Sequence, residues 1–397
     1  MRVMRLLAVL ASFPLALAAP ALRLQGEVAG PLVLTTPGLV VEGQGAVVRG
    51  KAGHTVRLLA PGIRVRGLRV VGAGPREDFF EPDAAFYLQG CHGCVLEDVR
   101  VEGAPTAVRA EDSRGLIVRR LRARGLRSAP GVLIYKSPRA QVEESRLEGY
   151  VDAIYVEYSP GLRLVKNALW GNSRYGFHVM FTWEAWVEEN RSWANAIGNA
   201  LMHGALNLVR GNRLEGHATP LGYGLLVQDE RQSQVLENTF LANTLGLVLL
   251  DAVGVEVRGN RFLENGTALR LTRERGANSA RVHGNAFQGN LYDLLVDDPQ
   301  AQAKVEGNAY DRASPLPVPH LPTGSFALFL ALQPELSLFA LSPGVVLWEA
   351  AEAQVPGLRL IALADNRAQS LPRGTRGQPV LVLLGLAGGL VWWRWKT

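Results

Sequence analysis

An asparagine that recurs about every 23 residues is the feature that most constrains the fold of this 397-residue chain. It follows a short apolar alternation each time, in the pairs Lys166-Asn167, Glu189-Asn190, Gly211-Asn212, Glu237-Asn238, Gly259-Asn260, Gly284-Asn285 and Gly307-Asn308. The series continues toward the N-terminus at Ser145, Arg120, Asp98, Gly67 and Gly43. Units this short cannot each bury a core, so they must stack against one another.

Within each unit, apolar and polar residues alternate in short runs that end at Gly, Asn or Ser-Pro, as in VEVRGNRFLEN. This alternation predicts strands with one buried face, about three per unit. The leucine-rich-repeat pattern with a helical half is absent from the sequence. We therefore predict an all-β chain, a right-handed parallel β-helix of roughly a dozen coils over about residues 24–312. The recurrent asparagines suit left-handed backbone at a turn, and their stacked amides predict a ladder along the axis.

The two ends of the chain are apolar. Residues 1–18 combine arginines, an apolar run and an A-x-A site, which predicts a secretory signal peptide and export to the periplasm. Residues 379–395 form a second apolar run rich in tryptophan and flanked by Arg and Lys. At about 1.5 Å per residue this run is short for a bilayer, so it predicts either a short inner-membrane anchor or a helix packed on a partner's membrane domain. Residues 313–378 are rich in Pro and Leu and are expected to cap the last coil.

The longest gap in the repeat, between Gly67 and Asp98, predicts an inserted loop that projects from one face. The chain's two cysteines follow it, Cys91 and Cys94 in CHGC. In an exported protein this pair is a disulfide, half of a soft-metal site, or two free thiols, and the sequence leaves all three open. The basic tract Arg114–Arg127 indicates solvated strand faces or, alternatively, a docking patch for an acidic partner or lipid headgroups. A nucleic-acid partner is not expected.

Residue columns follow from the repeat. Leu225, Leu247 and Leu269, spaced by 22 residues, are predicted to face the core. The same register turns Leu226 and Val248 outward.

In the coils before these, His178 and Met180 point outward, and Met202 lies 22 residues after Met180. Adjacent coils are about 4.8 Å apart, so the two methionines are predicted to stack on the outer face. They are the only methionines outside the signal segment, and Tyr155 and Glu157 are predicted to flank them. Thioether and imidazole together favour Cu(I), whereas a packing role for the methionines is the alternative. His203 falls at an inward or turn position, which weakens it as a ligand.

Many β-helices act on polysaccharides, so paired carboxylates need attention. Asp229 and Asp251 occupy equivalent positions 22 residues apart, with Arg273 one coil further on. They are the candidate catalytic residues of a polysaccharide lyase or hydrolase. The alternative is that both are turn-forming aspartates at strand ends.

The segments SRYGFHVMF, IGNALMH and LGYGLLVQD in successive coils, the closing NAYD and the tail LFALSPGVVLWEAAEA carry a family resemblance. The chain resembles the NosD family, exported β-helix proteins that help mature nitrous-oxide reductase. The resemblance covers most of residues 24–372, whereas CHGC and the apolar C-terminus depart from it.

The resemblance implies a non-enzymatic protein that scaffolds assembly of the reductase's copper–sulfide site. Its implied partners are an ABC-type ATPase and permease pair in the inner membrane, a copper chaperone and the reductase itself. The matching residues for contact with transient copper are His178, Met180 and Met202. An alternative within the same family is that this coil docks a partner and the metal binds elsewhere.

Overall fold

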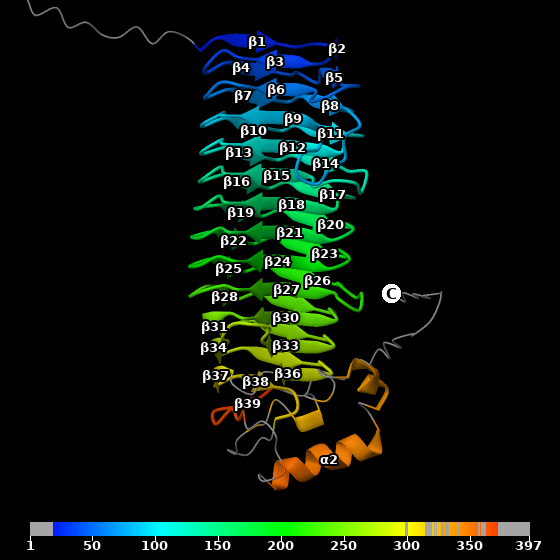
Figure 1. The fold of residues 1–397 in the computed structure, drawn as a ribbon, viewed down its shortest axis with the longest axis vertical. Coiled ribbons are helices and arrows are strands. Elements are labelled where there is room, and N and C mark those ends of the chain that lie inside the picture. The colour runs from blue at the N-terminus through cyan, green and yellow to red at the C-terminus, as the bar shows by residue number, and fades with distance from the viewer. Residues whose placement is uncertain are drawn as a thin grey trace, which may run out of the picture.

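The computed structural model describes residues 19–297 and 301–313, the stretches 324–326, 333–339, 342–355 and 363–371, and the single residues 320, 322, 329 and 358. Three parallel sheets run the length of a right-handed parallel β-helix of about 12 turns, which is the predicted fold (Figure 1). Each coil contributes one strand to each sheet, so neighbours in a sheet lie one coil apart in sequence. The predicted signal peptide and membrane anchor lie outside the described residues.

The first sheet has 13 strands. They are β1 (Ala21–Arg23), β4 (Val40–Glu42), β7 (Arg64–Arg66), β10 (Val95–Glu97), β13 (Ile117–Arg119), β16 (Gln141–Glu143), β19 (Arg163–Val165), β22 (Trp186–Glu188), β25 (Leu208–Arg210), β28 (Gln234–Leu236), β31 (Val253–Arg258), β34 (Ser279–His283) and β37 (Gln302–Glu306).

The second sheet has 14 strands. They are β2 (Glu27–Ala29), β5 (Val47–Arg49), β8 (Arg69–Val71), β11 (Arg100–Glu102), β14 (Arg122–Arg124), β17 (Arg146–Glu148), β20 (Ala168–Trp170), β23 (Arg191–Trp193), β26 (Arg213–Glu215), β29 (Thr239–Leu241), β32 (Arg261–Leu263), β35 (Ala286–Gln288), β38 (Ala309–Tyr310) and β39 (Gln369–Ser370).

The third sheet has 12 strands and carries most of the longest ones. They are β3 (Leu32–Leu34), β6 (Val56–Leu58), β9 (Ala84–Gln89), β12 (Thr106–Glu111), β15 (Val132–Tyr135), β18 (Asp152–Glu157), β21 (Tyr175–Met180), β24 (Gly198–Met202), β27 (Tyr223–Gln228), β30 (Leu245–Leu250), β33 (Thr267–Thr272) and β36 (Tyr292–Val296).

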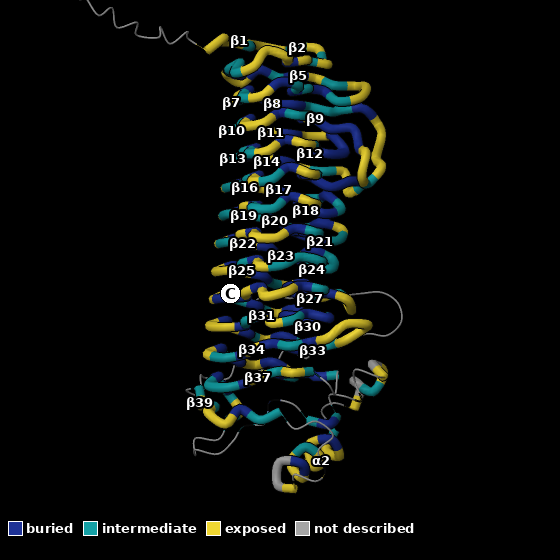
Figure 2. The backbone as a smooth tube through the Cα atoms, turned by 60° about the vertical axis from the view of Figure 1, so that its left-hand side comes forward, coloured by how far each residue is buried: buried dark blue, intermediate teal, exposed yellow. Residues whose placement is uncertain are grey.

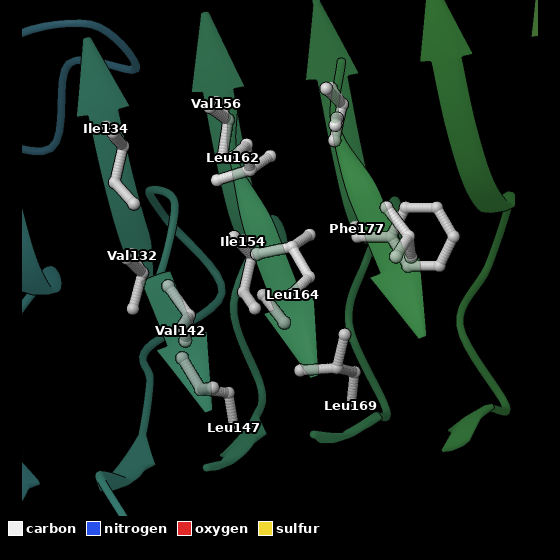
Figure 3. Packing of buried hydrophobic residues seen from close by; sticks show 14 of the residues in the cluster. Val132, Ile134, Val142, Leu147, Ile154, Val156, Leu162, Leu164, Leu169 and Phe177 are labelled. Atoms are coloured by element: carbon white, nitrogen blue, oxygen red, sulfur yellow. The ribbon is translucent and has the colours of Figure 1, made fainter. Parts of the chain in front are cut away.

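Every second side chain of these strands enters one continuous core, as the alternation predicts. Leu225, Leu247 and Leu269 are fully buried, and Leu247 is the register partner of the other two. Figure 3 shows such side chains from successive coils, Ile154 and Leu164 among them, meeting in the interior. Figure 2 shows the complementary pattern, with exposed residues gathered at the turns and outer faces. The core therefore follows the repeat register along its length.

The outer face of the third sheet departs from the prediction. Leu226 and Val248 point outward but are only 6% and 5% exposed. They join Tyr175 and Ala200 in a second apolar cluster outside the main core, against which Met202 packs. Long side chains from neighbouring strands cover this face. The alternation within one strand predicts the direction of a side chain but not its burial by such neighbours.

The asparagines form the predicted ladder. Oδ1 of Asn212, for example, accepts hydrogen bonds from the backbone N–H and the side-chain amide of Asn190, both at 2.9 Å. The prediction that the asparagine itself is left-handed is wrong, because the positive φ falls on the residue before it, at Glu189 and Gly211. This arrangement frees the asparagine side chain to turn inward and bind the next coil.

The last coil is covered by residues from the C-terminal part of the chain. The Asp365 carboxylate accepts from the backbone N–H of Gly307 and of Asn308, at 2.8 and 2.9 Å, and so continues the ladder beyond its last asparagine. This part of the chain forms a 3₁₀ helix, η1 (Pro334–Phe339), and an α-helix, α2 (Pro343–Gln354), which lies below the last coil in Figure 1. Glu352 accepts from the backbone N–H of Ser325 at 2.9 Å and thereby ties α2 to a second segment of this region.

Candidate metal centre

The two methionines meet on adjacent strands of the third sheet. Met180 on β21 is the register partner of Met202 on β24, as their spacing predicts, and of Glu157 on β18. Both thioethers are half-buried on the outer face. The Tyr155 hydroxyl lies 3.6 Å from the Met180 sulfur and donates to Glu157 Oε2 at 3.0 Å. Burial raises the pKa of Tyr155, so its hydroxyl remains a donor.

His178 leaves β21 on the same outer face but is not exposed. Its side chain is 6% exposed. The ring of Tyr155 meets it edge-on with centroids 5.1 Å apart, and the ring of Tyr175 lies 4.7 Å away. The alternation therefore predicted the direction of the imidazole correctly, whereas its solvent exposure is decided by these two tyrosines.

A buried carboxylate orients the imidazole. Nδ1 of His178 lies 3.1 Å from Oδ2 of Asp152, which is fully buried. Arg174 donates from Nε to the other carboxylate oxygen at 2.7 Å, so the charge of Asp152 is offset within the cluster. A carboxylate at this position holds the imidazole proton on Nδ1 and leaves the Nε2 lone pair available.

Nε2 of His178 is buried and has no hydrogen-bond partner among the described residues. A buried polar atom without a partner is rare in folded proteins, because its lost hydration is not replaced. A carboxylate on one ring nitrogen and a free lone pair on the other is the arrangement typical of a metal-binding histidine. Together with the two thioethers, this nitrogen supplies the soft and borderline donors that Cu(I) favours. The residues therefore fit copper, although no group of three or more His, Cys, Asp or Glu side chains in the described part of the chain forms a metal cluster on its own.

The inserted loop between β8 and β9 covers one side of the cluster. Phe79 meets the ring of Tyr155 edge-on at 5.1 Å, and the Arg174 guanidinium lies over the Phe79 ring at 4.6 Å. The loop stands out from the stack beside β9 and β12 in Figure 2. It thus reaches from its own coil to strand β18 and to the residue before β21, which places an aromatic cover next to the buried imidazole.

Sequence comparison identifies a family whose model covers this part of the chain. The family model described as "Periplasmic copper-binding protein (NosD)" matches residues 110–306, which include Asp152, His178 and both methionines. This β-helix belongs to the NosD family. No curated protein matches the chain significantly.

Solved structures with the same architecture are distant in sequence. The A-module of the Azotobacter vinelandii mannuronan C-5 epimerase AlgE6 is 17% identical with a TM-score of 0.50, over 70% of this chain and 85% of that one. The periplasmic alginate epimerase AlgG is 12% identical with a TM-score of 0.53, over 73% and 85%. A DFA-IIIase from Arthrobacter chlorophenolicus A6 is 14% identical with a TM-score of 0.51, over 68% and 84%. At these identities the likeness concerns the fold alone.

His203 occupies a turn after β24, which is one of the two positions that the repeat predicts for it. It has a φ of 57°, its ring stacks on Phe181 at 4.9 Å, and its Nδ1 lies 3.2 Å from Oδ2 of Asp229. Phe181 therefore covers one face of the His203 ring, and Asp229 occupies its Nδ1. His203 therefore lies beside the cluster without the buried orientation of His178.

Cys91 and Cys94 form a disulfide, and both are fully buried before β10. Of the three possibilities that the sequence left open, the structure contains the first. Because oxidised cysteines are not thiolate ligands, this pair supplies no soft-metal site in this protein.

Asp229 and Asp251, the candidate catalytic residues of a polysaccharide lyase or hydrolase, lie in turns. Asp229 and Asp251 both have a φ of 50°, as expected for aspartates at left-handed turn positions. Asp251 is 8% exposed and accepts from the backbone N–H of Glu274 and of Arg275 at 3.0 and 2.9 Å. Burial alone raises the pKa of this carboxyl, but the backbone amides outweigh it and lower the pKa below its ordinary value. A general acid needs the opposite shift.

Asp152 is the member of the cluster that the sequence analysis missed. It is the register partner of Tyr175 at the start of the third-sheet strands, where later coils carry Gly198, Tyr223 and Leu245. A single carboxylate in a column of small and apolar residues is the signal that would have marked it. The cover by Phe79 has no such signal, because the loop lies outside the repeat.

The predicted membrane anchor at 379–395 lies outside the described residues. Within the described part of the chain, no helix is both long and apolar enough to span a bilayer.

Proposed function

We propose that this protein is a non-enzymatic accessory protein that binds Cu(I) transiently at His178, Met180 and Met202 and passes it to the copper–sulfide site of nitrous-oxide reductase. The observation that carries the proposal is the unpartnered Nε2 of His178, oriented by Asp152 and placed on the strand that also bears Met180. The family description, a periplasmic copper-binding protein, supports the same ligand class.

The donor set suits a cargo that must be released. Two neutral thioethers and one neutral imidazole bind Cu(I) without adding negative charge, whereas thiolates would hold the ion more tightly. The half-exposed methionines form the accessible edge of the cluster and the buried histidine its inner wall. Copper would therefore enter over the methionines and reach the imidazole last.

A Cu(I) titration of the purified protein against a chromophoric Cu(I) chelator tests the site. Replacing both thioethers, Met180→Leu with Met202→Leu, preserves volume and is expected to weaken Cu(I) binding by at least about tenfold. Gln228→Leu is the matched control, since Gln228 is the register partner of Met202 one coil further along. Equal affinity in the double variant and the wild type would exclude the methionines as ligands.

We further propose that an ABC-type ATPase and permease pair at the inner membrane holds the C-terminal end of the protein. Helix α2 supports this, because Val346, Leu347 and Trp348 are 55%, 70% and 50% exposed. Exposed apolar side chains gathered on one helix are costly to leave in water and are typical of a partner interface. Trp348 donates to Glu352 within the helix, and Glu352 also accepts from the backbone N–H of Ser325, which holds the helix against a neighbouring segment.

Co-purification with the permease tests this contact. Leu347→Asp is expected to abolish co-purification, because it places a charge in the centre of an apolar interface. Val33→Asp is the control, since Val33 is 44% exposed on β3 at the opposite end of the β-helix. Retention of the permease by Leu347→Asp would contradict the proposed contact.

We propose that a copper chaperone delivers the ion across the surface beside the methionines. Trp183 in the turn after β21 and Trp186 at the start of β22 are 48% and 45% exposed and offer aromatic contact area there. Replacing both by alanine is expected to slow copper transfer from the loaded chaperone while the Cu(I) affinity stays unchanged. An unchanged transfer rate would place the chaperone elsewhere.

A further inference from the structure

The second sheet carries a column of arginines on its outer face, whereas the metal cluster lies on the third sheet. Arg100 on β11, Arg122 on β14 and Arg146 on β17 are register partners in three successive coils. All three point away from the core and are exposed. Neighbouring strands are about 4.8 Å apart, so three positive charges follow one another at that interval.

These three arginines differ from others at the same strand position. Arg69, Arg191 and Arg213 each bind a glutamate, Arg69 with Glu102 at 2.7 Å and the other two with Glu215 at 2.7 and 2.6 Å. Arg100, Arg122 and Arg146 have no hydrogen bond or ion pair from their side chains within the described residues. Like charges opposite one another on neighbouring strands destabilise a sheet. Folding therefore gains nothing from this column, and a bound anion would remove the repulsion.

The column lines a groove of about 460 Å³. The groove also includes Arg120, Lys166, Asp98 and Glu144. The charge of Asp98 is already offset, since Arg120 binds it at 2.6 Å and Arg66 lies 3.5 Å away. Arg120 also lies 3.9 Å from Glu144, and Lys166 lies 3.6 Å from Glu189. The free positive charge of the groove therefore resides in the three stacked arginines.

We propose that this groove binds an acidic linear segment of a partner protein, whose carboxylates pair with Arg100, Arg122 and Arg146. Guanidinium groups bind carboxylates through two parallel hydrogen bonds, so a row of them selects a row of acidic side chains. The column is one residue wide, with Asp98 and Glu144 on one side and Glu102 and Glu148 on the other. A flat anionic membrane would meet these acidic residues as well, whereas a narrow segment along the axis meets the arginines alone.

Binding of a fluorescently labelled ten-residue oligoglutamate peptide tests the proposal at low and moderate salt. The triple variant Arg100→Gln, Arg122→Gln, Arg146→Gln is expected to bind about tenfold more weakly or worse, if each lost pair contributes a factor of about two to five. Wild-type binding is expected to weaken as salt rises, because exposed charge pairs are screened.

The matched control is the triple variant Arg69→Gln, Arg191→Gln, Arg213→Gln. It removes the same charge from the same strand position, at sites where each arginine already has a glutamate partner. It is expected to bind the peptide within about twofold of the wild type, since its sites are already neutralised. A second readout, the midpoint of thermal unfolding at low salt, is expected to rise or stay level in the groove variant and to fall in the control.

Three results would overturn the proposal: no peptide binding by the wild-type protein, equal loss in both triple variants, or binding confined to phosphatidylglycerol vesicles. The last would make the column a membrane contact. Loss of peptide binding in the groove variant alone would establish the site, whatever the outcome of the copper titration.

Discussion

Asp152 decides which nitrogen of His178 keeps a free lone pair. Its carboxylate lies 3.1 Å from Nδ1, and the backbone N–H of Tyr175 donates to it at 3.3 Å. With the proton on Nδ1, the other nitrogen presents its lone pair. Asp152 acts through His178 and is a positioning residue.

Asp152→Asn is expected to weaken Cu(I) binding by about 10- to 100-fold, the range typical of a lost carboxylate behind a metal-binding histidine. An asparagine amide can donate to Nδ1, which would move the imidazole proton to Nε2 and block the ligand. The nitrogen NMR shifts of His178 report this change of tautomer, which a purely structural role would not cause. Glu111→Gln on β12 is the control, and unchanged affinity and tautomer in Asp152→Asn would refute the role.

Glu230 is a second buried carboxyl, one coil beyond Met202. It accepts from Ser233 Oγ at 2.6 Å and from the Asn207 amide at 3.0 Å. Burial raises its pKa from 4.5 to about 7, although the hydrogen bonds from Ser233 and Asn207 partly oppose the shift. The folded protein therefore holds a proton on Glu230 that the unfolded chain releases above about pH 4.5.

This proton makes stability depend on pH with a defined sign. Because the folded-state pKa is the higher one, the contribution of Glu230 is complete below about pH 4.5 and is lost as the pH rises through about 7. The loss is roughly 3 kcal/mol of unfolding free energy, at about 1.4 kcal/mol per pKa unit. Urea unfolding at pH 4.5 and pH 8 measures it. The Glu230→Gln variant is expected to lack this part of the pH dependence, and a parallel profile would contradict the account.

At the scale of elements, the asparagine ladder joins the turns of successive coils. Each rung fills a buried position where a backbone N–H of one coil would otherwise lack an acceptor. A second ladder on the other side of the second sheet includes His217, whose Nδ1 lies 3.2 Å from the backbone nitrogen of Asn195. Burial lowers the pKa of His217 to about 4, so it stays neutral and serves as a rung beside amides.

Asn212→Ala is expected to destabilise the β-helix by about 2–4 kcal/mol, since it leaves buried groups without partners. Both donors of Asn190 lose their acceptor, and the carbonyl oxygen of Val187 loses the Asn212 amide that lies 2.8 Å away. Gln234→Ala on β28 is the control, because that side chain is exposed and bonds to Glu256, which is also exposed to solvent in part. Chemical unfolding of both variants measures the difference; a loss in Asn212→Ala no larger than in the control would show that the rung is dispensable.

At the scale of the whole molecule, most of the features that could be predicted from the sequence follow from the repeat. A period near 23 specifies the coils, and within it the register of β21 and β24 pairs Met180 with Met202. Local alternation also predicts which side chains enter the core, as Leu247 and Phe177 do. These are properties of short-range pattern, and the parallel β-helix repeats them in every coil.

The rest depends on contacts that the period does not encode. His178 is buried because Tyr155 and Tyr175 cover it, and Phe79 reaches Tyr155 from a loop inserted several coils earlier. The role of Asp152 depends on the rotamers of two side chains 26 residues apart. The oxidation state of Cys91 and Cys94 is likewise a matter of pairing in space.

The central claim, that two thioethers and one imidazole of this NosD-type β-helix bind copper, is tested most directly by X-ray absorption spectroscopy of the Cu(I)-loaded protein. The account predicts a first shell containing both sulfur and imidazole nitrogen. The sulfur scattering should disappear in the Met180→Leu, Met202→Leu variant, and the imidazole contribution should disappear in His178→Gln. A shell without sulfur in the wild-type protein, or one unchanged in both variants, would contradict the account.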